Sequence, residues 1–123
     1  MIGYTTLGVA DMDKAKSFYG DLFADQGAKF VIDSGRIAFL GTKRGEPMLA
    51  LCQPYDGEAA TCGNGTMIAF PAETKEASDA LYHKAISLGA TCDGGPGQRI
   101  PDRFYGSYVR DLDGHKLCFF VFG

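Results

Sequence analysis

The spacing of apolar residues changes from strand-like to helical and back again in the first half of the chain. Residues 2–9 alternate as a half-buried strand does. Apolar residues then recur at helical spacing over 12–23, with Asp11 placed as N-cap and Gly27 just past the end. Three short apolar runs separated by turn-forming residues follow, at 28–33, 36–42 and 47–53. The pattern predicts a βαβββ unit.

The second half repeats this order of elements. Residues 66–70 read as a strand, and 74–88 as a helix with Thr74 as N-cap and Gly89 as its stop. The residues expected on the buried stripe of this helix are Ala77, Leu81, Ala85 and Leu88. Three further strands are predicted, at 90–93, 103–111 and 116–122, the last two joined by an Asp-Gly turn.

One segment of the second half departs from strand periodicity. Residues 93–106, "DGGPGQRIPDRFYG", are rich in Gly and Pro and are too irregular to form a strand throughout. Long irregular segments over a regular scaffold often cover binding sites. We therefore expect part of this segment to be a loop beside a site.

The repetition predicts one domain built from two copies of a unit. The copies span about 1–54 and 65–123, and residues 62–65 link them. Each half is too small to bury a sufficient core alone, so residues 1–123 are expected to form a single α+β domain. Two four-stranded sheets, each with a helix on one face, form a cupped mixed sheet around a cavity if they curve about one another.

Composition and charge narrow the class of protein. A chain that is 46% hydrophobic and 22% charged is typical of a globular protein. The net charge of −3 and the scattered Lys and Arg residues provide no basic stripe for nucleic acid. The sequence shows no signal peptide and no apolar run long enough for a membrane helix, so we expect a cytoplasmic protein.

The four cysteines are widely separated. Their spacing includes no CxxC pair, and so lacks the signature of a zinc site or a thioredoxin-like motif. An even number of cysteines leaves disulfides open, but free, mostly buried thiols are the simpler expectation for a chain without a secretion signal.

Three segments carry a resemblance to a known family. They are "TLGVADMDKAKSFYGDLF" at 6–23, "GNGTMIAFPA" at 63–72 and "YVRDLDGHKL" at 108–117. Together they resemble the vicinal oxygen chelate superfamily, which includes glyoxalase I, extradiol dioxygenases and the bleomycin and fosfomycin resistance proteins. The resemblance extends over essentially the whole chain and implies the glyoxalase-like fold, but not a particular reaction.

The resemblance also implies where a metal would bind. Metal-using members supply His from the first strand of each copy and Glu from the last, and the matching positions here hold Tyr4, Met67 and Cys118. The remaining position falls within residues 47–53, which contain neither His nor a carboxylate. We therefore expect no metal site and no cofactor. A divalent metal remains the alternative, as does a soft ion such as Cu(I) held by Met67 and Cys118.

Strand alternation and the family arrangement together predict a ligand-binding surface. Its expected residues are Tyr4, Thr6, Met67, Tyr108, Arg110, Cys118 and Phe120. Such a lining suits a small organic molecule, although the same residues could be core between two sheets. Arg110 either clamps an acidic ligand or pairs with Asp111 or Asp113 at the turn. Cys118 lines the pocket, or acts as a nucleophile if a base or cation lowers its pKa.

Three functions remain open from the sequence. The first is a glyoxalase/bleomycin-resistance-like protein that binds a small organic molecule in a mostly apolar cavity without metal. The second is a metal-dependent lyase, isomerase or dioxygenase of the same family. The third is a non-catalytic structural dimer. Homodimer formation is an expectation carried over from the family, and neither nucleic acid nor membrane is an expected partner.

Overall fold

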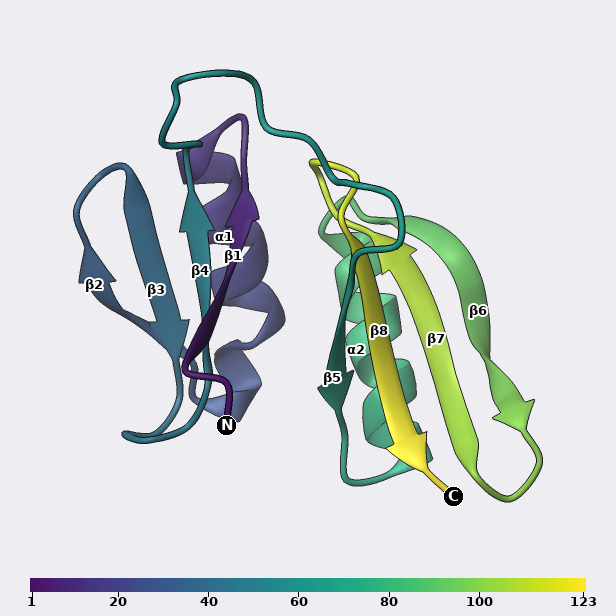
Figure 1. Ribbon diagram of the computed structural model, residues 1–123. Coiled ribbons are helices and arrows are strands. Elements are labelled where there is room, and N and C mark those ends of the chain that lie inside the picture. The colour runs from purple at the N-terminus through teal and green to yellow at the C-terminus, as the bar shows by residue number, and fades with distance from the viewer. The chain divides into compact units, whose positions relative to one another are not determined.

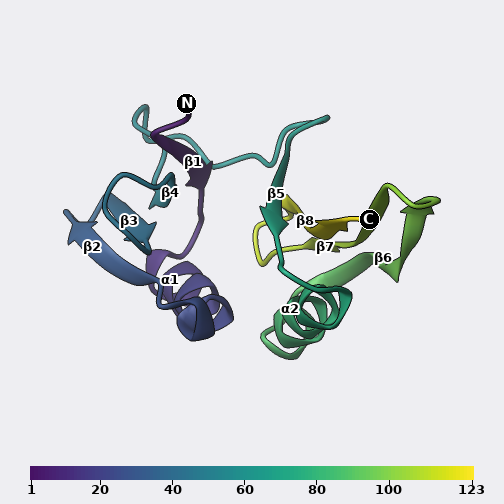
Figure 2. The same cartoon turned by 90° about the horizontal axis from the view of Figure 1, so that it is seen from below.

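The computed structural model describes all 123 residues, which form two compact units, Met1–Cys62 and Gly63–Gly123. Each unit contains one four-stranded sheet with an α-helix against one of its faces (Figure 1). Figure 2, a view from below, shows that the helix of each unit lies on one face of its own sheet. No helix of that unit covers the other face. The predicted α+β class and the βαβββ order of elements are confirmed.

The first unit follows the predicted order of elements closely. Its elements are β1 Tyr4–Gly8, α1 Met12–Leu22, a 3-10 turn at Ala24–Gln26, β2 Lys29–Asp33, β3 Ile37–Gly41 and β4 Met48–Cys52. The sheet order is β1-β4-β3-β2, in which β1 runs parallel to β4 and the other pairs are antiparallel. The predicted three-strand meander is therefore present, with the first strand placed beside its last strand.

The second unit has the same topology. Its elements are β5 Met67–Pro71, α2 Lys75–Ser87, β6 Thr91–Ile100, β7 Phe104–Arg110 and β8 Lys116–Phe122. The sheet order is β5-β8-β7-β6, with β5 parallel to β8. Each parallel pair is possible because a helix carries the chain from one end of the sheet back to the other.

Both helices begin where the sequence predicted. The Asp11 carboxylate accepts a hydrogen bond from the Lys14 amide at 3.0 Å, and the Thr74 hydroxyl accepts one from the Ala77 amide at 3.0 Å. These side chains satisfy amides that the first helical turn leaves without partners. The longer helix has 13 residues, and no helix is both long and apolar enough to cross a membrane.

Two local expectations for the second unit need correction. The strand expected at 90–93 is longer, because β6 runs from Thr91 to Ile100 and pairs with β7 through several register shifts, and within the segment 93–106 only residues 101–103 form a turn. Its glycines allow these bulges without ending the strand. On α2 the buried stripe was expected to include Ala77, but Ala77 is exposed and the neighbouring Ser78 is buried. The buried residues of this helix are Ser78, Leu81 and Ala85.

The core of each unit lies between the sheet and its own helix. In the first unit Leu7 and Leu51 are 3% and 0% exposed and form a register pair on the face that α1 covers. In the second, Leu117 and Phe119 of β8 are both 0% exposed and alternate with residues of the opposite face. This alternation fixes which side chains lie on the uncovered faces.

Gly106 of β7 is a position where a side chain does not fit. A Cβ there would lie 2.9 Å from the Phe119 carbonyl oxygen and 3.3 Å from the Phe120 Cβ. Because a backbone atom has to move, we expect Gly106→Ala to lower the free energy of unfolding by about 1–3 kcal/mol, measured by urea denaturation. Its register partner Gly97 is the matched control, since a Cβ there has only an ordinary 3.6 Å contact with Arg99. Equal stability of the two alanine variants would contradict this prediction.

Candidate functional site

The uncovered face of the first sheet carries both residues predicted there. Tyr4 is 54% exposed and Thr6 is exposed, whereas Leu7, which lies on the other face of β1 against the helix, is buried. The Tyr4 ring meets the edge of the Phe39 ring, with centroids 4.9 Å apart. Tyr4 and Thr6 pair in register with Met48 and Ala50 of β4. This face therefore offers a phenol and a hydroxyl beside the apolar side chains of Met48, Ala50 and Phe39.

The uncovered face of the second sheet carries the other five predicted residues. Strand register places them in rows: Met67 beside Lys116, Cys118 beside Tyr108, and Phe120 beside Gly106. Arg110 lies on the same side of β7 as Tyr108, two residues further along, and pairs in register with Lys116. We call this surface, formed by the outward residues of β5, β8, β7 and β6, the open face of the second unit.

One end of the open face is aromatic. The rings of Phe104 and Phe120 are stacked, with centroids 5.2 Å apart and planes inclined by 8°. The Phe122 ring packs edge-on against Phe120 at 5.0 Å and is 78% exposed. The absence of a side chain at Gly106 leaves room for this stack, because Phe104 and Phe120 both lie against that position.

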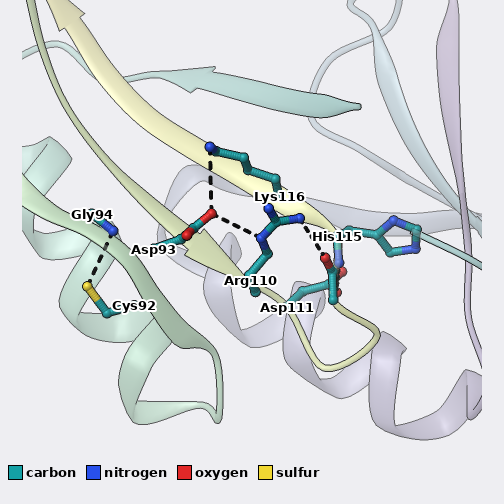
Figure 3. Close-up of polar contacts among 8 residues, drawn as sticks. Cys92, Asp93, Gly94, Arg110, Asp111, His115 and Lys116 are labelled. Atoms are coloured by element: carbon teal, nitrogen blue, oxygen red, sulfur yellow. Dashed lines mark hydrogen bonds and ion pairs between the residues drawn. The ribbon is translucent and has the colours of Figure 1, made fainter. Parts of the chain in front are cut away.

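The other end of the open face is charged. Arg110 donates to the Asp93 carboxylate at 3.0 Å, and the Lys116 ammonium lies 3.6 Å from the same oxygen (Figure 3). Arg110 also donates to the Gly114 carbonyl at 3.1 Å. The sequence left open whether Arg110 clamps an acidic ligand or pairs with Asp111 or Asp113, and in the structure it is bonded to Asp93 on β6. That contact was missed because β6 and β7 become neighbours only through sheet pairing.

The turn between β7 and β8 is held by Asp111. Its carboxylate accepts hydrogen bonds from the Asp113 amide at 2.9 Å and the His115 amide at 2.8 Å. Gly114 takes a left-handed backbone conformation, with φ of 88°, that suits the Asp-Gly signal in the sequence. This turn fixes where Arg110 and Lys116 enter the open face.

Cys118 is fully buried even though its strand position belongs to the open face. Burial raises the pKa of its thiol, and the positive charges of Arg99 and Lys116 offset this only in part. The thiol is therefore protonated at neutral pH. A nucleophilic role requires a thiolate, so this environment favours a pocket-lining role.

Cys92 on β6 is in the opposite situation, which the sequence did not indicate. It is exposed, its sulfur accepts a hydrogen bond from the Gly94 amide at 3.4 Å, and the Tyr82 hydroxyl of α2 donates to it. The hydrogen bond from Tyr82 is the main cause that lowers the pKa of the Cys92 thiol, followed by the one from Gly94. The signal was absent from the sequence because Tyr82 and Cys92 lie on different elements.

The donor atoms at the family's metal positions do not fit a hard cation. Tyr4 supplies a phenol, Met67 a thioether and Cys118 a protonated thiol, while β4 supplies only apolar side chains and the thiol of Cys52. Divalent ions in such sites take carboxylate oxygens and imidazole nitrogens. The structure contains no group of three or more His, Cys, Asp or Glu side chains arranged to hold a metal ion.

The comparisons with known proteins agree with the topology. A family model for the glyoxalase/bleomycin resistance protein/dioxygenase superfamily matches residues 1–119. A search of curated protein sequences found no match. A glyoxalase/bleomycin resistance protein from Albidiferax ferrireducens has a similar structure, with a TM-score of 0.87 and 31% identity over 100% of this chain and 99% of its own.

Two further solved structures share the fold. An enzyme of the same family description from Burkholderia phytofirmans has a TM-score of 0.82 at 22% identity, covering 98% of each chain. A lactoylglutathione lyase from Agrobacterium tumefaciens has a TM-score of 0.72 at 24% identity, covering 98% of this chain and 92% of its own. At these identities the likeness extends to the fold alone.

Proposed function

Because this chain belongs to the glyoxalase/bleomycin resistance protein/dioxygenase superfamily, we propose that it binds a small organic molecule without the help of a metal ion. Its binding residues are Tyr4 and Thr6 on the first sheet, and Met67, Tyr108, Arg110, Cys118 and Phe120 on the second. The enclosed cavity predicted from the sequence remains part of this proposal.

The observation that carries the proposal is the chemistry of the open face. Aromatic rings stack at one end of it, where Phe122 is 78% exposed, and Met67, beside Lys116 at the other end, is 44% exposed. Apolar and aromatic surface with a few polar groups is typical of sites for small organic molecules, which bind by burial and ring stacking. A surface of this kind suits an aromatic ligand.

A metal-dependent lyase, isomerase or dioxygenase is the competing function within the superfamily. In such an enzyme the ion polarises substrate oxygens as a Lewis acid. The side chains of Tyr4, Met67 and Cys118 favour the metal-free function, because a phenol, a thioether and a protonated thiol replace the expected imidazoles and carboxylates.

The metal question has a direct test. We expect protein purified without added metal to contain divalent ions well below one per chain when measured by elemental analysis. We also expect Mn²⁺, Zn²⁺ or Ni²⁺ to leave the thermal unfolding midpoint unchanged, since an ion bound only by the folded state raises that midpoint. A divalent ion retained at one per chain through dialysis contradicts the proposal and favours the metal enzyme.

Binding of organic molecules is tested by the same thermal measurement. A neutral aromatic probe such as naphthalene-2-carboxamide, at about ten times its Kd, is expected to add about 1.4 kcal/mol to the free energy of unfolding. Phe120→Ala should weaken this effect, while Tyr55→Ser, at a position 91% exposed in a loop of the first unit, should preserve it. An unchanged midpoint in the wild-type protein contradicts binding.

A further inference from the structure

We infer that the open face of the second unit selects a planar aromatic anion, and that Arg99 is the residue that recognises its negative charge. The inference rests on the proposed function and adds to it the class of ligand. Arg99 was not among the residues predicted from the sequence. It lies on β6, in the segment that had been expected to be partly loop.

Arg99 and Lys116 both lie against the ring of Tyr108. The Arg99 guanidinium carbon lies 5.3 Å from the centroid of the Tyr108 ring, and the Lys116 ammonium nitrogen lies 4.9 Å from it. Arg99 is on β6 and Lys116 on β8, the two strands that flank the strand of Tyr108. Two cations from different strands therefore converge on one aromatic ring in the middle of the open face.

The cations on this face differ in their partners. Asp93 is the carboxylate of the local cluster, and it contacts Arg110 and Lys116 at 3.0 and 3.6 Å. Arg99 forms no ion pair, and its guanidinium hydrogen-bonds to the Gly95 carbonyl. Asp93 therefore pairs with two cations at once, and the guanidinium of Arg99 has a neutral carbonyl as its partner in place of a carboxylate. A cation that is not already paired with a carboxylate favours an anionic ligand.

The Arg99 guanidinium has hydrogen-bond donors to spare for a ligand. Arg presents five N–H donors in a planar fork, and the bond to Gly95 uses one of them. The fork matches a carboxylate, which accepts two parallel hydrogen bonds. Arg99 is exposed, so an incoming ligand has access to it.

The aromatic stack lies close to the ring of Tyr108 along the strand. Tyr108 and Gly106 are two residues apart on β7, and Phe120 pairs with Gly106. Alternate residues of a strand are separated by about 7 Å, which is close to the length of a fused two-ring system. A ligand whose carboxylate meets Arg99 can therefore place its rings along Phe120. These spacings suit an aromatic carboxylate better than an aliphatic one.

The test uses two probes of the same shape and different charge. Naphthalene-2-carboxylate and naphthalene-2-carboxamide are titrated by calorimetry into the wild-type protein, into Arg99→Gln, and into Arg103→Gln as the matched control. Arg103 is an exposed arginine in the turn between β6 and β7, so the control removes the same charge from the same hairpin. Circular dichroism checks that all three proteins are folded.

We expect the wild-type protein to bind the carboxylate about 10-fold tighter than the carboxamide. Arg99→Gln should abolish this preference by weakening the carboxylate alone, Arg103→Gln should keep it, and raising the salt concentration should reduce it. Equal affinity of the two probes, or a preference that survives Arg99→Gln, overturns the inference while leaving the proposed function standing. Failure of both probes to bind overturns the proposed function and the inference together.

Discussion

Replacing Phe119 by Ala is expected to lower the free energy of unfolding by about 3–5 kcal/mol. Phe119 is 0% exposed, and its ring lies 6.1 Å from the Phe70 ring of β5 on the side of the sheet that α2 covers. Removing a buried ring loses its transfer free energy and leaves a cavity, because a helix and a sheet joined by short connections close only partly around it.

Phe122 provides the matched control on the same strand. It is 78% exposed and contacts the rings of Phe104 and Phe120 on the open face. Phe122→Ala should lose only part of those ring contacts, worth about 0.5–1.5 kcal/mol. Urea denaturation followed by circular dichroism measures both variants, and the milder Phe119→Leu keeps the test informative if Phe119→Ala is unfolded. Equal losses for Phe119→Ala and Phe122→Ala would contradict the assignment of the two faces.

Local signals in the sequence were enough to predict most of the secondary structure. Asp11 and Thr74 cap their helices through amides three residues away, so the information lies in a short window. The alternation along β8 likewise placed Cys118 and Phe120 on one face of the strand, because each strand position alternates regardless of what the strand pairs with. The prediction on α2 failed where Ala77 was preferred to Ser78, since a helix can bury a small polar residue that hydrophobic spacing does not mark.

The features that were missed depend on pairing between distant segments. The sequence of β6, with "GGPGQR" at 94–99, has the composition of a loop, and it is a strand because β7 supplies hydrogen-bonding partners along it. Its extension carries Arg99 onto the open face. The ion pair between Asp93 and Arg110 arises from the same pairing. Intrinsic propensity is a weak guide wherever a neighbouring strand provides the decisive contacts.

The position of Arg99 also changes which part of the molecule we assign to ligand recognition. From the sequence, Arg110 was the candidate for an acidic ligand, but in the structure it is bonded to Asp93 and to the Gly114 carbonyl. An arginine already paired with a carboxylate loses that interaction when it binds another anion. Arg99 has no carboxylate partner to give up, so recognition of a negative charge at Arg99 is the less costly arrangement.

The second large effect concerns the thiols, and it separates the two roles considered for Cys118. We expect iodoacetamide at neutral pH to alkylate Cys92 at least about 100-fold faster than Cys118 in the folded protein. The reactive species is the thiolate. The Tyr82 hydroxyl and the Gly94 amide lower the pKa of Cys92, and burial raises the pKa of Cys118. A lowered pKa means that Cys92 holds more thiolate at neutral pH, and its exposure lets the reagent reach it.

Peptide mapping by mass spectrometry over a time course measures the rate at each cysteine, and alkylation in urea shows that Cys118 reacts once it is unfolded. Tyr82→Phe is the matched variant, because it keeps the ring on α2 and removes the hydroxyl that donates to Cys92. It should slow alkylation of Cys92 at neutral pH and leave alkylation of Cys118 unchanged. The difference at Cys92 between the wild-type protein and Tyr82→Phe should vanish at a pH at which the Cys92 thiol is fully ionised in both proteins. Rapid alkylation of Cys118 in the folded protein would mean that a thiolate forms on the open face after all. The nucleophilic role would then be favoured over pocket lining, because only a thiolate supplies the attacking electron pair.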